Sequence, residues 1–238
     1  MNSYLHSLRH LAAVALAIAA LMPAMQSCLD DDGDSRTTWQ PTAVVTVCPA
    51  ADKSFTLILD DSTTLVPANM KASPFGDKEV RALATFTFAD NDRNHSRSVY
   101  VQRLDSIRTK QPVATLGTAD GTTYGDDPIE IVRDWVTVAE DGYLTLRIRT
   151  RWGNAGQRHD INLVSGTNPD NPHEFVLRHN AHGDTVGSWG DALVAFDLNS
   201  LEAETNLPLR LTLRWQAFDG WKQTTFDLRL RPKTVANG

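Results

Sequence analysis

The chain has 238 residues, of which 41% are hydrophobic and 22% are charged, and its formal net charge is −6. The hydrophobic fraction is too high for an intrinsically disordered protein and is sufficient to bury a core. The mild acidity disfavours non-specific attraction to nucleic acid, so no nucleic-acid partner is expected.

The first 27 residues have the organisation of a secretory signal peptide. Arg9 supplies positive charge, and Leu11–Met22 consists almost wholly of Ala, Leu, Val and Ile. This run is shorter than the roughly 20 residues of a membrane-spanning helix, but it fits the apolar core of a signal. A buried core helix is the alternative, although no amphipathic pattern accompanies the run. We therefore expect residues 1–27 to be a signal peptide.

The cysteines bear on how the mature chain begins. Met25-Gln26-Ser27, directly before Cys28, resembles a bacterial lipobox, although Met25 and Gln26 replace its usual aliphatic and small residues. This resemblance implies that Cys28 carries a thioether-linked lipid and that the protein is held at a membrane. Cys48, the other cysteine, would then be a lone thiol in a strand. The alternative is a Cys28–Cys48 disulfide, because exported chains normally use cysteines in pairs.

Aspartates follow Cys28 closely, which raises the question of a calcium site. With Gly33 at position 6 of an EF-hand loop, Cys28 would fall at position 1 and Trp39 at position 12, so the ligand pattern fails. We predict that residues 28–40 are an acidic tether. Acids after a lipidated cysteine also resemble a surface-export signal of Bacteroidetes lipoproteins. The expected location is the outer membrane, with lipid anchoring and exposure at the cell surface.

From Pro41 onward the hydrophobic period is two, which predicts an all-β protein. Phe86 and Phe88 alternate with Thr85 and Thr87, as expected for a strand with one core face and one solvent face. The strands expected in the first half are residues 43–48, 54–59, 80–89 and 98–107.

The second half alternates more regularly and fits a β-sandwich of about seven strands. Tyr143–Trp152 is one clear strand, and Asp219-Gly220 between two alternating runs predicts a C-terminal hairpin. Further strands are expected at residues 135–138, 160–164, 174–178 and 193–197. The segment 117–128, rich in Gly, Thr and Asp, reads as a linker between domains 41–116 and 129–238, or alternatively as a long hairpin loop within one domain.

Three stretches resemble the NigD-like lipoproteins of Bacteroidetes. These are Cys28-Leu29-Asp30-Asp31-Asp32, Ala84-Thr85-Phe86-Thr87-Phe88 and the run VYVQRLDSIRTKQP at residues 99–112. The resemblance implies an N-terminal OB-like β-barrel followed by a C-terminal immunoglobulin-like β-sandwich. The family is named for an association with bacteriocin production and has no established catalytic residues, so no active site is transferred.

Candidate catalytic and metal sites are weak. A zinc site would need a turn to gather His179, His182 and Asp184, whereas His173 would lie too far along the strand, so polar loop residues are the simpler interpretation. Residues 187–190, GSWG, lack the pattern of a serine nucleophile and read as a turn. Asp60-Asp61 and Asp126-Asp127 read as turn residues. We predict no catalytic residue, metal or cofactor.

Two further sets of residues are candidates for function. One set is an arginine-rich face that would bind an anionic glycan or polymer, or else a solvated face paired with acids such as Asp227 and Asp160. It comprises Arg147, Arg149, Arg151, Arg210, Arg214, Arg229 and Arg231. The other set matches an O-glycosylation pattern typical of the phylum, in which an aspartate precedes the modified residue: Ser62, Ser106 and Thr185.

Together these features predict a lipid-anchored binding protein of the cell envelope rather than an enzyme. Its expected partners are the membrane, through the anchor, and an envelope protein or glycan. A carbohydrate-directed enzyme or accessory protein is the alternative, and a bacteriocin-related role is a third possibility that rests on the resemblance. The sequence predicts no oligomeric state.

Overall fold

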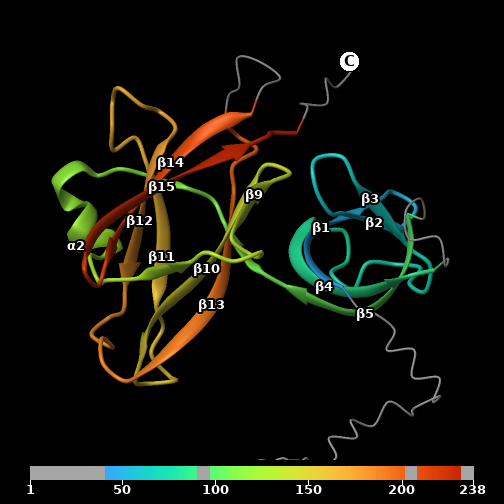
Figure 1. Ribbon diagram of the computed structural model, residues 1–238, viewed down its shortest axis with the longest axis horizontal. Coiled ribbons are helices and arrows are strands. Elements are labelled where there is room, and N and C mark those ends of the chain that lie inside the picture. Colours follow the sequence, from blue (N-terminus) through green and yellow to red (C-terminus); the bar gives the residue numbers. More distant parts are fainter. Residues whose placement is uncertain (1–40, 90–96, 202–207, 232–238) are drawn as a thin grey trace, which may run out of the picture. The chain divides into compact units, whose positions relative to one another are not determined.

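The computed structural model describes residues 41–89, 97–201 and 208–231. The expected signal peptide and tether, with Cys28, lie outside these residues. The described residues all belong to one compact unit. Its described part is almost entirely β-structure, as the alternating pattern predicted, and consists of a barrel and a sandwich (Figure 1).

The N-terminal half is a closed five-stranded barrel with the strand order β1-β2-β3-β5-β4. Alternation places one face of each strand inside, so that Val45, Leu57, Leu65, Ala84 and Phe86 form the centre of the barrel core. The strands are β1 (Thr42–Pro49), β2 (Phe55–Ile58), β3 (Thr64–Pro67), β4 (Val80–Phe88) and β5 (Ser98–Ser106).

The C-terminal half is a sandwich of two five-stranded sheets. The first sheet contains β6 (Arg108–Lys110), β13 (Ser188–Asp197), β10 (Tyr143–Trp152) and β8 (Glu130–Val132), with β9 (Val138–Glu140) also paired to β10. The second has the order β15 (Gly220–Leu228), β14 (Leu209–Ala217), β12 (Glu174–Asn180), β11 (Asp160–Ser165) and β7 (Val113–Ala114). Leu146, Phe175, Leu177, Phe196 and Leu213 are central members of the core.

The structure moves the expected domain boundary. The short strands β6 and β7 pair with β13 and β11, so the sandwich begins directly after Ile107 rather than after a linker at residues 117–128. Part of that segment forms a 3-10 helix, Gly117–Ala119, and the helix α2, Asp120–Tyr124. Buried Asp120 accepts hydrogen bonds from the Leu116 N–H and the Thr115 hydroxyl, which stabilises this turn.

Two other local expectations also change. Residues 135–137 precede β9 instead of forming a strand, and Trp135 is an exposed side chain. Residues 188–190, expected in a turn, begin β13 and pair with β10. Short polar or Gly-containing segments carry a weak period-two signal. Residues 188–190 therefore form a strand only because the long strand β10 lies beside them.

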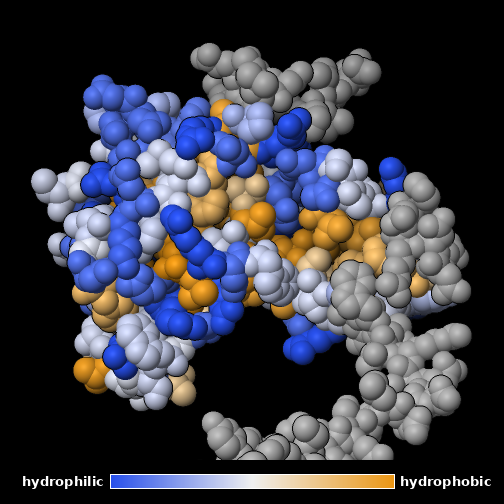
Figure 2. Space-filling view, in the orientation of Figure 1, coloured by the Kyte–Doolittle hydropathy of each residue, from blue (hydrophilic) through white to orange (hydrophobic). Residues whose placement is uncertain are grey.

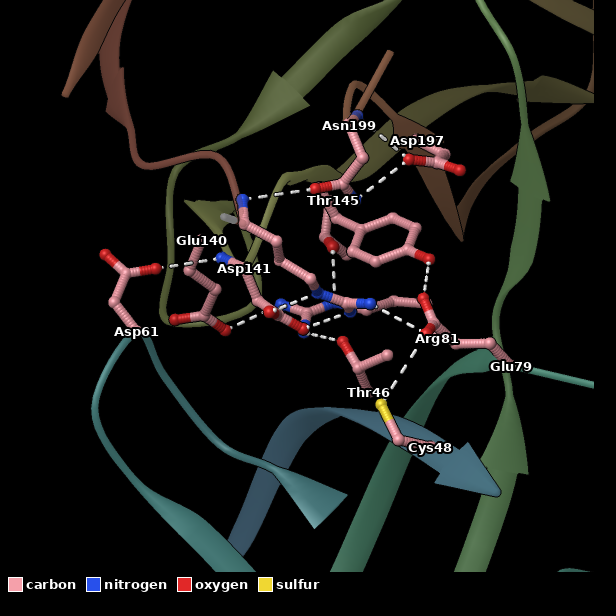
Figure 3. Close-up of polar contacts among 12 residues, drawn as sticks. Thr46, Cys48, Asp61, Glu79, Arg81, Glu140, Asp141, Thr145, Asp197 and Asn199 are labelled. Carbon is pink, nitrogen blue, oxygen red and sulfur yellow. Dashed lines mark hydrogen bonds and ion pairs between the residues drawn. The ribbon is translucent and has the colours of Figure 1, made fainter. Parts of the chain in front are cut away.

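Arg81 is the most unusual buried residue of the barrel. Its side chain is 0% exposed although it lies on β4 among apolar neighbours. The guanidinium donates to Thr46 on β1 at 2.9 Å, to Thr145 on β10 at 3.3 Å and to Glu140 on β9 at 2.6 Å (Figure 3). Burial raises the pKa of Glu140 despite the opposing charge of Arg81. One cation thus satisfies acceptors on strands of both domains.

A second polar cluster adjoins Arg81 and involves Arg231, which follows β15. Arg231 donates to Asp141 at 2.6 Å and to Glu79 at 2.7 Å, and the Tyr143 hydroxyl donates to Glu79 at 2.5 Å. Burial and Glu79 raise the pKa of Tyr143, so its hydroxyl stays protonated. Burial also raises the pKa of the Cys48 thiol to about 12, which makes it unreactive at neutral pH.

We predict that Arg81→Met lowers the free energy of unfolding by about 3–5 kcal/mol, because it leaves Glu140 half-buried without its cation. Denaturant unfolding at pH 7 measures the loss. Arg103→Met is the matched control: Arg103 is 73% exposed and pairs with exposed Asp105, so its loss should stay below about 1 kcal/mol. Adding Glu140→Leu to Arg81→Met should recover part of the stability. Equal losses in the two single variants would contradict this account.

Candidate functional site

A cleft of about 650 Å³ opens on the sandwich beside the β14–β15 hairpin. Its volume lies within the usual range of ligand sites. One wall comes from the 3-10 helix and α2, and the opposite wall comes from the hairpin. Residues from both walls and from the floor line it: Gly117, Thr118, Gly121, Thr122, Asp126, Pro128, Arg178, Gln216, Ala217, Phe218 and Trp221.

Local contacts hold residues 125–129, which form part of the cleft floor, against the second sheet. Gly125 has φ +93°, and a Cβ there would collide with the His179 carbonyl, so only glycine allows this approach. Asp127 accepts the Ala181 N–H at 2.7 Å, and the Ile129 N–H donates to Gln216 at 2.9 Å. The β14–β15 hairpin itself is the one predicted from Asp219-Gly220.

Trp221 and Arg178 dominate the chemistry of the cleft. Trp221 is 52% exposed, and the guanidinium of Arg178 lies 5.6 Å from the centre of its ring. Arg178 also forms an ion pair with Asp126. Its Nε is buried and has no hydrogen-bond partner among the described residues.

The aromatic surface continues beyond the cleft. Phe218, 42% exposed, contacts the Trp189 ring edge-to-face with 4.8 Å between centroids, and Trp189 is 48% exposed. Arg151 lies 3.9 Å over Trp189. Hydrophobic residues reach the viewed surface in several patches among hydrophilic ones (Figure 2), so exposed apolar area alone does not mark a site. Exposed aromatics combined with arginines distinguish this end of the sandwich.

A chain of buried polar side chains lies behind Arg178. On the adjacent residue, His179 Nδ1 is 3.2 Å from the Pro128 carbonyl, and its Nε2 is 2.9 Å from His159 Nδ1. His159 Nε2 in turn is 3.2 Å from Asp184, and the His159 ring stacks on Trp152 with 3.9 Å between centroids. Pro128 lines the cleft, so this chain fixes part of its floor.

The proton count of this chain determines its charge. The Pro128 carbonyl only accepts, so we assign a proton to His179 Nδ1 and a second to His159 Nδ1. The contact between His159 and Asp184 requires a third proton, which two neutral imidazoles and a carboxylate do not supply. N–H donation from Asn154 and Gly153 lowers the pKa of Asp184, and burial lowers the pKa of His179. The lowered pKa keeps His179 neutral, so its Nδ1 donates to the Pro128 carbonyl and its Nε2 accepts from His159.

The arrangement differs from the zinc site considered from sequence. His179 and Asp184 both contact His159, which the sequence did not single out, whereas His182 pairs with Asp160 at 2.8 Å. No group of three or more His, Cys, Asp or Glu suited to a metal occurs in the described part of the chain.

The seven arginines do not form one continuous face. Three lie on β10, two on β14 of the other sheet, and two follow β15. Most are engaged locally. Asp191 accepts from Arg147 and Arg149. The other acidic partners are Asp134 for Arg147, Asp227 for Arg210, Glu174 for Arg214, Asp61 for Arg229, and Glu79 with Asp141 for Arg231; Arg151 covers Trp189. Of the seven, Arg214 lies 5.6 Å from the centre of the Trp221 ring. Arg178, which lines the cleft at the same distance from that ring, was not highlighted by sequence patterning.

The three candidate glycosylation residues are all exposed: Ser62, Ser106 and Thr185. Their modification stays a prediction. Asp60 accepts the N–H groups of Ser62 and Thr63, as expected for a turn aspartate, while Asp61 accepts the Asp141 N–H.

Two family models match the chain in order. The model of the NigD-like N-terminal OB domain matches residues 44–107, and that of the NigD-like C-terminal beta sandwich domain matches residues 111–228. The chain belongs to the NigD-like family. The resemblance seen in the sequence is confirmed, as are the OB-type barrel and the sandwich. No curated protein matches the chain.

Several solved structures share the two-domain NigD-like fold. A "putative toxin related protein" from Parabacteroides distasonis is 29% identical, with TM-score 0.67, covering 80% of this chain and 94% of that one. A NigD-like immunity protein from Bacteroides caccae is 21% identical, with TM-score 0.57 and coverages of 77% and 91%. A "putative lipoprotein" from Bacteroides fragilis is 15% identical, with TM-score 0.56 and coverages of 82% and 100%. At these last two identities the likeness shows the fold alone.

We predict that His179→Asn flattens the pH dependence of stability. In the wild type, unfolded His179 has its ordinary pKa of 6.5, whereas burial lowers the pKa in the folded state. The contribution of His179 to the free energy of unfolding is therefore fully present above pH 6.5. It declines as the pH falls towards the pKa of the folded state, by up to about 1.4 kcal/mol per pH unit.

The variant keeps an N–H for Pro128 but removes this titration, and denaturant unfolding across the acidic range measures the difference. His173→Asn, outside the buried chain, is the control and should retain the wild-type slope. An unchanged slope in His179→Asn would refute the assignment.

Proposed function

We propose that this NigD-like protein is a lipid-anchored binding protein of the bacterial outer membrane, with Cys28 as its anchor and the Trp221 cleft as its ligand site. The N-terminal sequence supports the anchor, as does the description of one structural neighbour as a lipoprotein. No helix among the described residues is long and apolar enough to cross a membrane.

The exposed Trp221 beside Arg178 is the observation that carries the binding role. Tryptophan and arginine are the side chains that most often supply binding energy at recognition sites, and half of the Trp221 surface is left uncovered. An exposed aromatic in a concave site with a few convergent polar groups is typical of ligand binding.

The same residues support binding over catalysis. Asp126 is the acidic residue lining the cleft, and it is paired with Arg178. Hydrolysis of a glycosidic bond ordinarily needs two carboxylates placed on either side of the bond. The His159–Asp184 pair is buried, with side chains 1% and 7% exposed, and is turned towards Trp152 rather than towards solvent.

A role in immunity to a toxin is a second candidate. Two structural neighbours are described as a NigD-like immunity protein and as a toxin related protein. In that case the ligand of the cleft would be a protein toxin. Protease treatment would destroy such a ligand, whereas it would leave a non-protein envelope ligand intact.

The anchor is tested with Cys28→Ala in the native host. Without the thiol no lipid can be attached, so we expect the protein to leave the membrane fraction on detergent-phase partitioning. Globomycin, which blocks lipoprotein signal cleavage, should cause the wild-type precursor to accumulate. A Cys28→Ala protein that is processed normally and still enters the detergent phase would contradict the anchor.

The binding role is tested with Trp221→Ala. The probe is the envelope fraction of the native host lacking its own copy of the gene, and the ligand-binding protein is the mature chain with Cys28→Ala. We expect binding to fall at least about tenfold, equivalent to about 1.4 kcal/mol. Trp135→Ala is the matched control, since Trp135 is 59% exposed and does not line the cleft. Equal binding by the Trp221→Ala and Trp135→Ala proteins would contradict the assigned site.

A further inference from the structure

We propose that the ligand of the Trp221 cleft is a neutral oligosaccharide. This inference rests on the proposed function, because it names the class of molecule that the same cleft binds. Four properties of the cleft lead to it: its flat aromatic surfaces, its polar groups, the pairing of its charged side chains and its extension along the sandwich.

The aromatic surfaces suit a ring with an apolar face. Trp221 and Phe218 both line the cleft, and both remain about half exposed. A pyranose ring presents C–H groups on its faces and hydroxyls around its rim. The sugar can therefore stack its face on an aromatic ring while its hydroxyls make hydrogen bonds around the rim. Such stacking buries apolar surface and fixes the orientation of the sugar.

The polar groups suit hydroxyls, which donate and accept at the same time. Asp126 is an acceptor and Arg178 a donor, and their pairing places the two functions side by side. Gln216 adds an amide, and Thr118 and Thr122 add hydroxyls at the opposite wall. Adjacent hydroxyls of one sugar ring match such a set.

The charged side chains at the cleft favour a neutral ligand over an ionic one, because each already has a partner of opposite charge. Arg178 is paired with Asp126, and Lys222 next to Trp221 is paired with two acids, Glu130 at 3.2 Å and Asp219 at 2.8 Å. An anionic ligand would compete with Asp126 for Arg178. A wholly apolar ligand would remove water from the Asp126–Arg178 pair without replacing it, which is costly.

The aromatic surface is longer than one sugar ring needs. Phe218 contacts Trp189, whose exposed ring extends the surface from β15 of one sheet to β13 of the other. The concave part, about 650 Å³, is also larger than a monosaccharide. A chain of several sugar units would occupy the cleft and continue over Trp189.

The test uses envelope fractions of the native host in three forms: untreated, oxidised with sodium periodate, or digested with proteinase K. Periodate cleaves the vicinal diols of sugars, whereas proteinase K removes protein. For the mature chain with Cys28→Ala, we expect binding to fall at least tenfold after periodate and to persist after proteinase K. Trp221→Phe, which keeps a stacking ring, should bind better than Trp221→Ala.

The outcomes separate this inference from the proposed function. Binding that survives periodate and is lost after proteinase K overturns the saccharide while leaving a binding role for the cleft, now for a protein. No binding to untreated envelopes overturns both. If both treatments abolish binding, protein-free polysaccharide extracted from the same envelopes decides: Trp221-dependent binding to it supports the inference, and its absence overturns it.

Discussion

The buried Arg81 side chain is the constraint on which the arrangement of this protein depends. A fully buried guanidinium is stable only when its N–H groups find acceptors, and here the acceptors come from β1 of the barrel and from β9 and β10 of the sandwich. The neighbouring apolar cluster of Val44, Ile107, Val136 and Ala195 adds contacts that do not select a geometry so strictly. The buried ion pair of Arg81 and Glu140 therefore makes the packing of β4 against β9 and β10 specific. Apolar burial supplies most of the favourable free energy of folding.

The same principle operates below the proposed ligand site. Three hydrogen bonds in sequence link Pro128, His179, His159 and Asp184, so the cleft floor is held by polar groups that have few alternative partners. Stacking on Trp152 covers the imidazole of His159. A cleft held in this way keeps the Trp221 and Phe218 side chains exposed. This preorganisation favours ligand binding, because the protein loses less conformational entropy when the ligand binds.

The sequence was informative where a single strand carries its own pattern. Long alternating strands such as Tyr143–Trp152, the Asp219-Gly220 hairpin and the C-terminal sandwich were predictable in this way, whereas the barrel was implied only by the family resemblance. Short strands such as β6 and β7 were not, because they form only when β13 and β11 are already in place. The cleft was missed for a similar reason: Trp221, Arg178 and Asp126 are far apart in the sequence and meet only in the fold. The signal available was an aromatic on the polar side of an alternating strand, as Trp221 is in β15.

The central claim is that the Trp221 cleft binds an envelope ligand, and indole N–H resonances report on it most directly. Protein-free polysaccharide from the native envelope is titrated into the mature chain carrying Cys28→Ala, and the indole resonances are followed by NMR. The account predicts saturable shifts for Trp221, smaller ones for Trp189 and none for Trp135. Shifts of equal size at Trp135, or none at Trp221 while binding is detected by another method, would contradict it.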